Sequence, residues 1–313
     1  MSATPRLLMV LSENWTLTPP RDLRALVELA VTAEAEGVDG VMLSEHVVLG
    51  RSADARGPMA NPRDYAAPGN QDPAMPWPSS TVLLSAIAAR TEHLRLVAGA
   101  VIAPLRHPLA LAKDLGTLDL LAQGRLVVLP TVSWHEDEYA ALGVPFHERG
   151  AILDEQLEVL HLCWTQPGPV SHHGRYFAYD DIWVEPMPYA PGGPDLWFGG
   201  QTMHGTLLRR LVRWGSGFNP FGTPTADDLA ALDEGLRTAG RDPADMEMVG
   251  GIRGRFPDGS GPADLDEALA ALPAQLAAGF GTICFKPSMY LDDPRGLGPF
   301  CRILRQRVEA MAS

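Results

Sequence analysis

Cysteine is scarce in this sequence, and long apolar runs are absent. The 313 residues include three scattered cysteines, Cys163, Cys284 and Cys301, with no CxxC spacing. This pattern implies no disulfide framework and favours buried small side chains. No stretch of about 18 apolar residues occurs, so we expect no membrane span. Residues 1–11 lack the basic and apolar regions of a signal peptide, so we expect a cytoplasmic protein.

Positive charge is also in short supply. The formal net charge is −13, and lysine and arginine form no cluster of the kind that binds nucleic acid. The sequence has no HxH or HExxH pair, which leaves a metal site with little support, and we expect none. It has no GxSxG for a nucleophilic hydrolase and no GxGxxG for a Rossmann dinucleotide site. Binding of a phosphorylated cofactor would therefore depend on local backbone amides and a few placed side chains.

What the sequence does contain is a regular alternation of strands and helices. A glycine follows a helical segment at Gly37, Gly124, Gly240 and Gly279, where it would supply the left-handed residue of a helix cap. The predicted strands cover residues 7–11, 39–43, 94–98, 125–129, 196–198, 217–219, 246–249 and 282–285, and a last helix runs through residues 300–311. Eight such units without a linker predict a single-domain (β/α)8 TIM barrel over residues 1–313.

Two segments interrupt this alternation. Residues 50–79 form a long loop after the second strand, rich in Pro, Gly, Asn and Asp. Loops of this length are commonly lids, and this one would lie over the top of the barrel. Residues 167–194 predict a hairpin excursion before the fifth strand, with residues 176–179 as its strand-like part.

Glu45 and His46 follow the second predicted strand. The active site of a (β/α)8 barrel lies at the carboxyl ends of its strands, so residues at this point are site candidates. Histidine there can donate a proton or bind a cofactor ring. A structural histidine bonded to a loop carbonyl is equally compatible with the sequence.

A second candidate is the run Gly199, Gly200, Gln201 and Thr202, between the fifth strand and a predicted helix. Two glycines allow the backbone to approach a ligand, and a helix N-terminus offers free N–H groups to a phosphate. A plain tight turn is the alternative interpretation.

Several sequence strings resemble the luciferase-like superfamily of (β/α)8 barrels, which use FMN or the deazaflavin coenzyme F420. The resemblance covers nearly the whole chain. Its most typical positions are Thr91, Arg95, Arg106-His107-Pro108, Ala112-Lys113, Thr117-Leu118-Asp119, Gly124-Arg125, Trp134, Glu138-Tyr139, Leu142-Gly143 and Phe146-His147-Glu148-Arg149. These strings identify the family better than they identify its chemistry.

The resemblance also implies a cofactor site. Glu45 and His46 match the pair that ends the second strand in the F420 branch, where the histidine lies beside the redox-active ring and Glu45 would orient it. Gly99, Ala100 and Val101 match the end of the third strand, where many members carry a bulge with a non-proline cis peptide bond. The run of residues 199–202 matches the turn that cradles the phosphate or ribityl end of the cofactor.

One departure from the family pattern lies after the fourth strand. Members commonly have Gly-x-Gly before a tryptophan, whereas this chain has Thr131, Val132 and Ser133 before Trp134. Thr131, Ser133 and Trp134 are therefore candidates for hydrogen bonds and contacts to the cofactor. The added side chains would equally narrow the pocket enough to alter or prevent cofactor binding.

The resemblance favours an oxidoreductase that transfers a hydride between coenzyme F420 and a small organic substrate, with Trp15, Tyr65, Trp77 and Trp134 as candidates for an apolar substrate wall. An FMN-dependent monooxygenase, which uses O2 and reduced flavin from a partner reductase, is the first alternative. A barrel that binds flavin without turnover, or binds no cofactor, is the second. The resemblance further implies a homodimer formed through residues 80–90 and 109–121.

Overall fold

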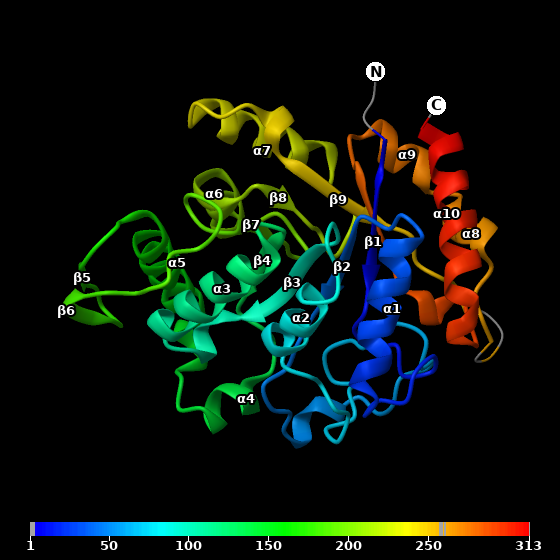
Figure 1. Ribbon diagram of the computed structural model, residues 1–313, viewed down its shortest axis with the longest axis horizontal. Helices are drawn as coiled ribbons and strands as arrows, with labels where there is room; N and C mark the ends of the chain where they lie inside the picture. The colour runs from blue at the N-terminus through cyan, green and yellow to red at the C-terminus, as the bar shows by residue number, and fades with distance from the viewer. Residues whose placement is uncertain (1–3, 257–258, 260, 313) are drawn as a thin grey trace.

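A closed barrel of eight parallel strands forms the centre of the computed structural model, which describes residues 4–256, 259 and 261–312 (Figure 1). The strand order around the barrel is β1-β10-β9-β8-β7-β4-β3-β2. The barrel strands are β1 (Arg6–Val10), β2 (Gly40–Leu43), β3 (Arg95–Ile102), β4 (Leu126–Thr131), β7 (Asp195–Phe198), β8 (Gly217–Phe218), β9 (Glu247–Gly251) and β10 (Thr282–Phe285). The predicted (β/α)8 architecture and all eight predicted strands are confirmed.

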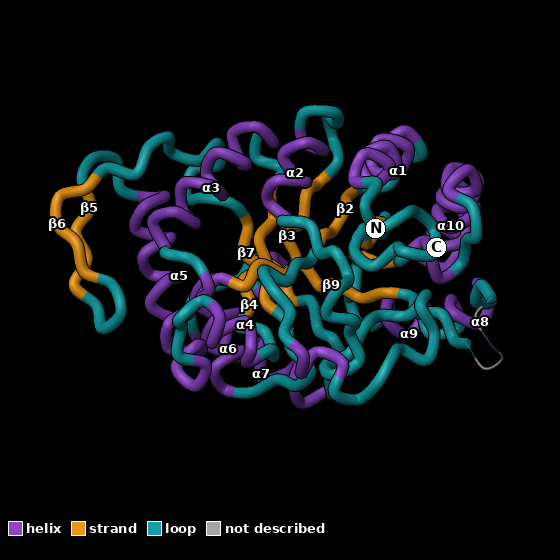
Figure 2. The backbone as a smooth tube through the Cα atoms, turned by 90° about the horizontal axis from the view of Figure 1, so that it is seen from below, coloured by secondary structure: helices purple, strands orange, loops and turns teal. Residues whose placement is uncertain are grey.

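Helices surround the barrel, as Figure 2 shows with strands at the centre and helices outside. They are α1 (Leu23–Ala35), α2 (Ser80–Ala88), α3 (Pro108–Ala122), α4 (Glu136–Ala141), α5 (Arg149–Thr165), α6 (Gly205–Trp214), α7 (Ala226–Thr238), α8 (Leu265–Leu269), α9 (Leu272–Ala277) and α10 (Leu297–Ala312). Gly37, Gly124, Gly240 and Gly279 all have φ between +74° and +87°, as expected for helix caps. In the described part of the chain, no helix combines the length and apolar character needed to cross a membrane.

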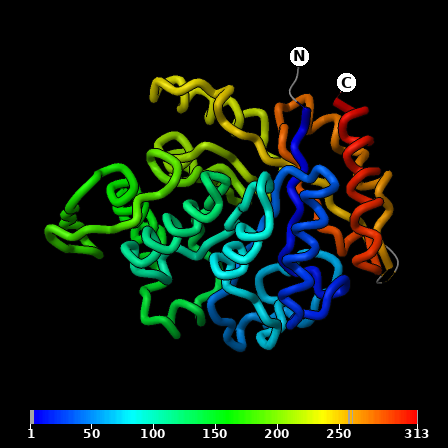
Figure 3. The backbone as a smooth tube through the Cα atoms, in the orientation of Figure 1, coloured from blue at the N-terminus to red at the C-terminus, as the bar shows by residue number. Residues whose placement is uncertain are grey.

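The start of α1 differs from the sequence pattern. Thr18 and Pro19 suggest a capped helix start, but the helix begins four residues later. The Asp22 side chain accepts a hydrogen bond from the amide of Ala25 and is the N-cap, whereas the Thr18 hydroxyl donates to the Asn14 carbonyl. Helices α1 and α10 lie side by side, which brings the first and last helices of the chain together where β1 pairs with β10 (Figure 3).

Alternate residues of each strand face two different cores. One set fills the barrel: Leu8, Val10, Met42, Val97, Val127, Leu129, Trp197 and Val249. The other set, which includes Leu7, Met9, Leu96 and Ala98, packs in the larger core with residues of the helices. Strands buried on both faces explain the continuous apolar runs in the sequence.

The long loop after β2, residues 50–79, is called the lid below. The Arg63 guanidinium donates to the carbonyls of Ser288 and Leu291 at 2.9 Å each. Arg253 binds the Asp64 carboxylate through two hydrogen bonds of 2.9 and 3.0 Å. The lid therefore lies over the carboxyl ends of the strands, called the barrel mouth below, as predicted.

The predicted excursion before the fifth barrel strand is a hairpin of β5 (Val170–His173) and β6 (Ala178–Ile182), which projects away from the barrel (Figure 1, left). The predicted strand over residues 176–179 was wrong at its start, because β6 begins at Ala178. Tyr176 and Phe177 lie in the connecting turn, where their amides donate to the buried side of the Glu155 carboxylate.

Candidate active site

Glu45 is buried just beyond the end of β2 and binds three other parts of the mouth. Its carboxylate accepts hydrogen bonds from the Ser80 hydroxyl at 2.7 Å and from the amide of Ile102 at 3.4 Å. It also forms an ion pair of 2.7 Å with Arg106. Glu45 therefore ties β2 to the start of α2 and to the end of β3.

The prediction that Glu45 orients His46 was wrong, because a different carboxylate contacts the His46 ring. The carboxylate that meets His46 belongs to Glu138 of α4, with Oε2 at 3.3 Å from Nδ1. A carboxylate can only accept, so Nδ1 carries a hydrogen, and in the neutral imidazole Nε2 then keeps its lone pair. The Glu45 carboxylate is instead engaged by Ser80, Ile102 and Arg106, which turn it away from this role.

His46 is held between two tryptophans. Its ring meets Trp77 edge-on at 5.2 Å between centroids, and Trp134 at 5.9 Å. Among the described residues, Nε2 has no hydrogen-bond partner, and neither has the buried indole Nε1 of Trp77. His46 Nε2 thus has unused acceptor capacity, and the buried N–H of the neighbouring Trp77 has unused donor capacity.

Three polar residues at the start of α4, His135, Asp137 and Glu138, bind residues 47–52, where the chain leaves β2 and enters the lid. Oε1 of the fully buried Glu138 accepts from the amides of Val47 at 2.5 Å and Val48 at 3.2 Å. His135 Nε2 accepts from the amide of Gly50 at 2.7 Å, and burial lowers the pKa of its ring. Asp137 binds the amide and hydroxyl of Ser52. The signal for these contacts was the acidic run directly after Trp134 and His135, which sequence reasoning used only to identify the family.

The cis peptide bond expected at the end of the third strand lies between Gly99 and Ala100. The pairing of β3 with β4 shifts by one residue between Gly99 and Val101, which is the predicted bulge. Gly99 and Val101 are buried, while Ala100 is half-buried and packs against the side chains inside the barrel.

Thr131, Ser133 and Trp134 are half-buried after β4. Ser133 has φ +57°, a left-handed conformation that favours glycine, and its Oγ lies 3.5 Å from Glu138. Ser133 therefore holds a backbone conformation that glycine would adopt without strain.

Gly199 and Gly200 are half-buried after β7, and Gln201 and Thr202 are exposed. A Cβ on Gly199 would lie 2.0 Å from the carbonyl oxygen of Asn219, so only glycine fits there. Helix α6 begins three residues after Thr202. Its N-cap His204 accepts from the amide of Leu207, and within the described residues no acceptor faces the amides of Gly205 and Thr206.

The structure therefore brings the predicted residues together on four adjacent strands. Strands β2, β3, β4 and β7 are neighbours in the barrel and carry the segments around His46, Ala100, Ser133 and Gly199 in turn. We call this side the β2–β7 half of the mouth.

The opposite side contains a cluster that the sequence did not assign. Lys286, directly after β10, is fully buried, and its Nζ donates to the Asp64 carbonyl at 2.6 Å and lies 5.0 Å from the Tyr65 ring centroid. Burial lowers the pKa of Lys286 to about 8, although Glu13 and Asp64 oppose the shift. Burial also raises the pKa of Glu13, which follows β1 and accepts from the amide of Ala66 at 2.7 Å.

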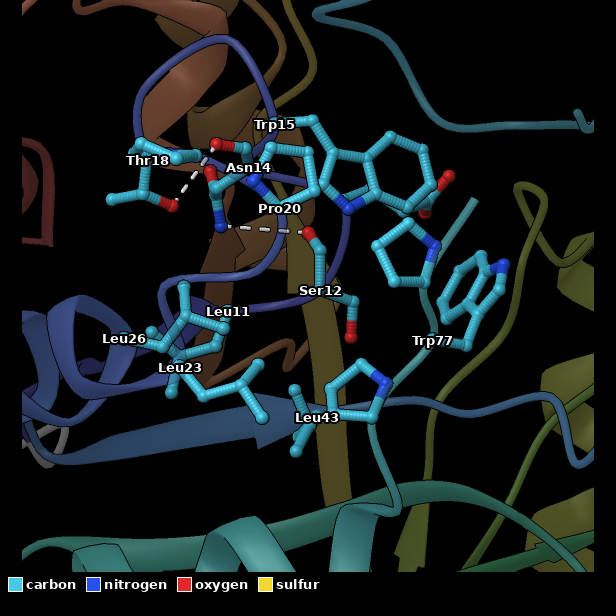
Figure 4. Close-up of a pocket in the computed structure, with 14 residues that line it drawn as sticks. Leu11, Ser12, Asn14, Trp15, Thr18, Pro20, Leu23, Leu26, Leu43 and Trp77 are labelled. Carbon is cyan, nitrogen blue, oxygen red and sulfur yellow. Dashed lines mark hydrogen bonds between the residues drawn. The ribbon is translucent and has the colours of Figure 1, made fainter. Parts of the chain in front are cut away.

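A pocket of about 360 Å³, including the part open to solvent, lies beside Glu13. Figure 4 shows Trp15 and Trp77 on one side of it and Leu23, Leu26 and Leu43 on the other, with Ser12 between. The two tryptophan rings meet edge-on at 5.5 Å. Of the four aromatics proposed as a substrate wall, Trp77 thus contacts both Trp15 and His46, Trp134 contacts His46, and Tyr65 lies over Lys286.

Across residues 4–256, 259 and 261–312, no three His, Cys, Asp or Glu side chains are arranged to hold a metal ion. Cys163 and Cys301 are buried, Cys284 is half-buried, and all three are free thiols.

Comparisons with known proteins show what this chain is similar to. The F420-dependent glucose-6-phosphate dehydrogenase of Kineococcus radiotolerans is 28% identical over 69% of this chain and 59% of its own length. The FMNH2-dependent dimethylsulfone monooxygenase of Pseudomonas putida is 31% identical over 39% of this chain and 34% of its own. The chain spans less than two thirds of the length of such relatives.

A solved structure extends the likeness of the fold to almost the entire chain. The monooxygenase RslO1 from Streptomyces bottropensis superposes with a TM-score of 0.67 at 19% identity, covering 96% of this chain and 98% of its own. The sequence profile of the luciferase-like monooxygenases matches residues 6–254. The chain thus belongs to the luciferase-like monooxygenase family, a family of oxidoreductases that includes F420-dependent and FMN-dependent members.

Proposed function

We propose that this protein is an F420-dependent oxidoreductase that transfers a hydride to or from a small organic substrate. The observation that carries the proposal is the setting of His46, fixed through Nδ1 by a buried carboxylate and framed by Trp77 and Trp134. This arrangement would offer the lone pair of Nε2 to a donor group on the ring, while the indole N–H of Trp77 is buried and would reach a ring acceptor only after the lid moves. When bound, the deazaflavin would supply the carbon that carries the hydride.

The residues of the β2–β7 half fit such a group. Ala100 offers a small apolar surface at the bulge of β3, and the free donor on Trp77 faces no protein acceptor in the described residues. The glycines at 199 and 200 and the open amides of Gly205 and Thr206 suit the phosphate end. Thr131 and Ser133 would donate hydrogen bonds from the intervening strand.

The test is a fluorescence titration of the purified protein with oxidised F420 and, in parallel, with FMN. We expect micromolar or tighter binding of F420 and at least tenfold weaker binding of FMN. The variant H46Q should weaken F420 binding about tenfold, which corresponds to about 1.4 kcal/mol. H173Q is the matched control, because His173 lies exposed on the β5–β6 hairpin.

An FMN-dependent monooxygenase is the second candidate, favoured by the likeness to the dimethylsulfone monooxygenase. Tight binding of FMN alone would replace the first proposal with this one. The protein would then need reduced flavin from a partner reductase, and a coupled assay with any flavin reductase and O2 would test it.

A protein without turnover is the third candidate. It is favoured by the side chains of Thr131 and Ser133, which depart from the Gly-x-Gly pattern of the family that the sequence resembles. Failure to bind either cofactor would support it and overturn the oxidoreductase proposal. Binding restored by a T131G/S133G variant would identify those two side chains as the obstacle.

We also propose a homodimer formed through α2 and α3. Val82 on α2 is 71% exposed, and Leu121 on α3 is 50% exposed, so both helices offer an apolar side chain to a partner surface. Light scattering coupled to gel filtration should give twice the monomer mass. The variant V82E/L121E should reduce it to the monomer mass, while I303E on α10, also an exposed apolar position, should not.

A further inference from the structure

Lysine is almost absent from this chain, which makes the position of Lys286 informative. Of the 25 lysine and arginine residues, only Lys113 and Lys286 are lysines. Lys113 is exposed and donates to the Glu185 carbonyl. Arginine supplies the other cations and stays charged in proteins, whereas a buried lysine readily loses its proton and offers a compact amine. A site that uses lysine in such a chain points to a need for that amine.

The ammonium group of Lys286 has unused hydrogen-bonding capacity. It carries three hydrogens, yet in the described part of the chain its one acceptor is the Asp64 carbonyl of the lid. The Asp64 carboxylate is engaged by Arg253, and the Tyr65 ring covers the amine from the side. The other ionisable neighbour, Glu13, accepts from the amide of Ala66. The lid thus provides a single neutral oxygen to this amine.

The Lys286 cluster faces the same opening as the proposed cofactor site. Lys286 follows β10 and Glu13 follows β1, and β1 lies between β10 and β2, which leads to His46. Tyr65 packs on the barrel interior together with Ala100 from the bulge of β3. Glu13 lines the pocket beside Trp15 and Trp77, and its charge interacts with both Lys286 and His46. Glu13 and Trp77 therefore connect this pocket to the Lys286 cluster and to His46, although neither Lys286 nor His46 lines it.

We propose that Lys286 is a catalytic residue that binds the oxygen of a neutral carbonyl or hydroxyl substrate and exchanges a proton with it, at the position now taken by the Asp64 carbonyl. The inference rests on the proposed oxidoreductase function and adds a substrate class to it. Because Lys286 is fully buried, residues 63–66 of the lid must move before the substrate oxygen can reach Nζ.

The atoms of the reaction balance with Lys286 in this role. In reduction, the carbonyl carbon accepts a hydride from the reduced cofactor, an N–H bond of the ammonium breaks, and an O–H bond forms on the substrate. In oxidation, the hydroxyl proton passes to the neutral amine while the carbon loses its hydride to the oxidised cofactor. The pKa of Lys286, lowered to about 8, suits an amine that must act in both forms near neutral pH.

Two features favour a neutral substrate oxygen over a carboxylate. The acceptor that the structure places on Nζ is an uncharged carbonyl. Glu13 lies in the same cluster, and a second carboxylate there would be repelled by it. The net charge of −13 adds to that repulsion.

The experiment uses the scarcity of lysine. In the variant K113R, Lys286 is the single lysine, so its modification by methyl acetimidate can be followed by peptide mass spectrometry. With oxidised F420 bound, the probes are three ketones, acetone, cyclohexanone and acetophenone, and the three carboxylates of matching shape, acetate, cyclohexanecarboxylate and benzoate. We expect at least one ketone to slow the modification of Lys286 threefold or more, and the carboxylate of matching shape to have no effect. Equal rates with all six, or slowing by carboxylates alone, would overturn the proposal.

Variants then separate catalysis from structure. K286M should bind F420 within twofold of the parent but reduce the protecting ketone with reduced F420 at least 100-fold more slowly, with loss of the ionisation near pH 8 from the rate profile. K113R is the matched control and should retain the parent rate. Unchanged reduction by K286M would refute the role of Lys286 while leaving the oxidoreductase intact. Failure of the parent protein to bind F420 or FMN would instead overturn the function on which the inference rests.

Discussion

Replacing Glu138 should separate its structural contribution from its effect on His46. In E138A, the amides of Val47 and Val48 lose the buried carboxylate that accepts from them, although both valines are themselves partly exposed. A hydrogen bond to a charged group contributes about 1.5–3 kcal/mol, and water can replace part of it here, so we expect a loss of about 2–3 kcal/mol in the free energy of unfolding. Glu136 lies exposed in the first turn of the same helix, and E136A should change stability by less than about 0.5 kcal/mol.

The isosteric variant E138Q tests the second contribution. Its amide oxygen can still accept from Val47 and Val48, so the loss should be about 1 kcal/mol. Its NH2 group would face Nδ1 of His46, which would then have to accept. The hydrogen on the imidazole would move to Nε2, and the free lone pair at the mouth would be replaced by a donor.

Urea unfolding measures the first effect, and 15N NMR of the histidine side chains measures the second, with the His46 signals identified from their loss in H46Q. We expect E138Q to be close to the parent in stability but to show the Nε2–H tautomer and F420 binding weakened about tenfold. Equal stability of E138A and the parent would refute the structural argument. An unchanged tautomer in E138Q would refute the assignment of Glu138 as the partner that sets His46.

Three further outcomes follow from local geometry and charge. S133G should raise the free energy of unfolding by about 1 kcal/mol, because glycine adopts the left-handed conformation of residue 133 without strain, whereas S133A should not raise it. Equal melting temperatures of the two variants in calorimetry would contradict this argument. G199A should lower stability by about 2–3 kcal/mol in urea unfolding, since the new Cβ meets the Asn219 carbonyl oxygen, whereas G205A, whose Cβ finds ordinary space, should not. Burial lowers the pKa of His135, so below about pH 6.5 the unfolded chain binds more protons than the folded one and the free energy of unfolding should fall. Measured by urea unfolding between pH 7.5 and 5, this free energy should fall more steeply with pH in the parent than in H135Q. An equal pH dependence in the two proteins would contradict the assignment.

The architecture could be predicted because it depends on local patterns. Strands buried on both faces give apolar runs, and helix caps at Gly37, Gly124, Gly240 and Gly279 need a left-handed residue. Both signals lie within a few neighbouring residues, so a single sequence carries them. Even so, the N-cap of α1 is Asp22 and not Thr18. The sequence offers both residues as N-caps, and only the hydrogen bonds that each one makes in the folded chain decide between them.

The sequence predicted where the residues of the candidate site lie, but not which side chains form hydrogen bonds with each other. Residues after parallel strands meet at one end of a barrel, which placed the segments around His46, Ala100, Ser133 and Gly199 together before any coordinates were known. The resemblance to a family added which of them would lie beside a cofactor. Neither source named Glu138 as the partner of His46, because 92 residues separate the two along the chain.

By itself, then, the sequence determined the eightfold alternation, the lid after the second strand, the location of the mouth and the family. The tertiary structure decided which carboxylate meets His46, that Glu45 instead ties β2 to α2 and β3, and that Lys286 is buried beneath residue 64 of the lid. The physical reason is the range of the interactions. Backbone periodicity and capping act between residues close in sequence, whereas hydrogen bonds and burial of charge at the mouth join groups that only the closed barrel brings within 3 Å or so of each other.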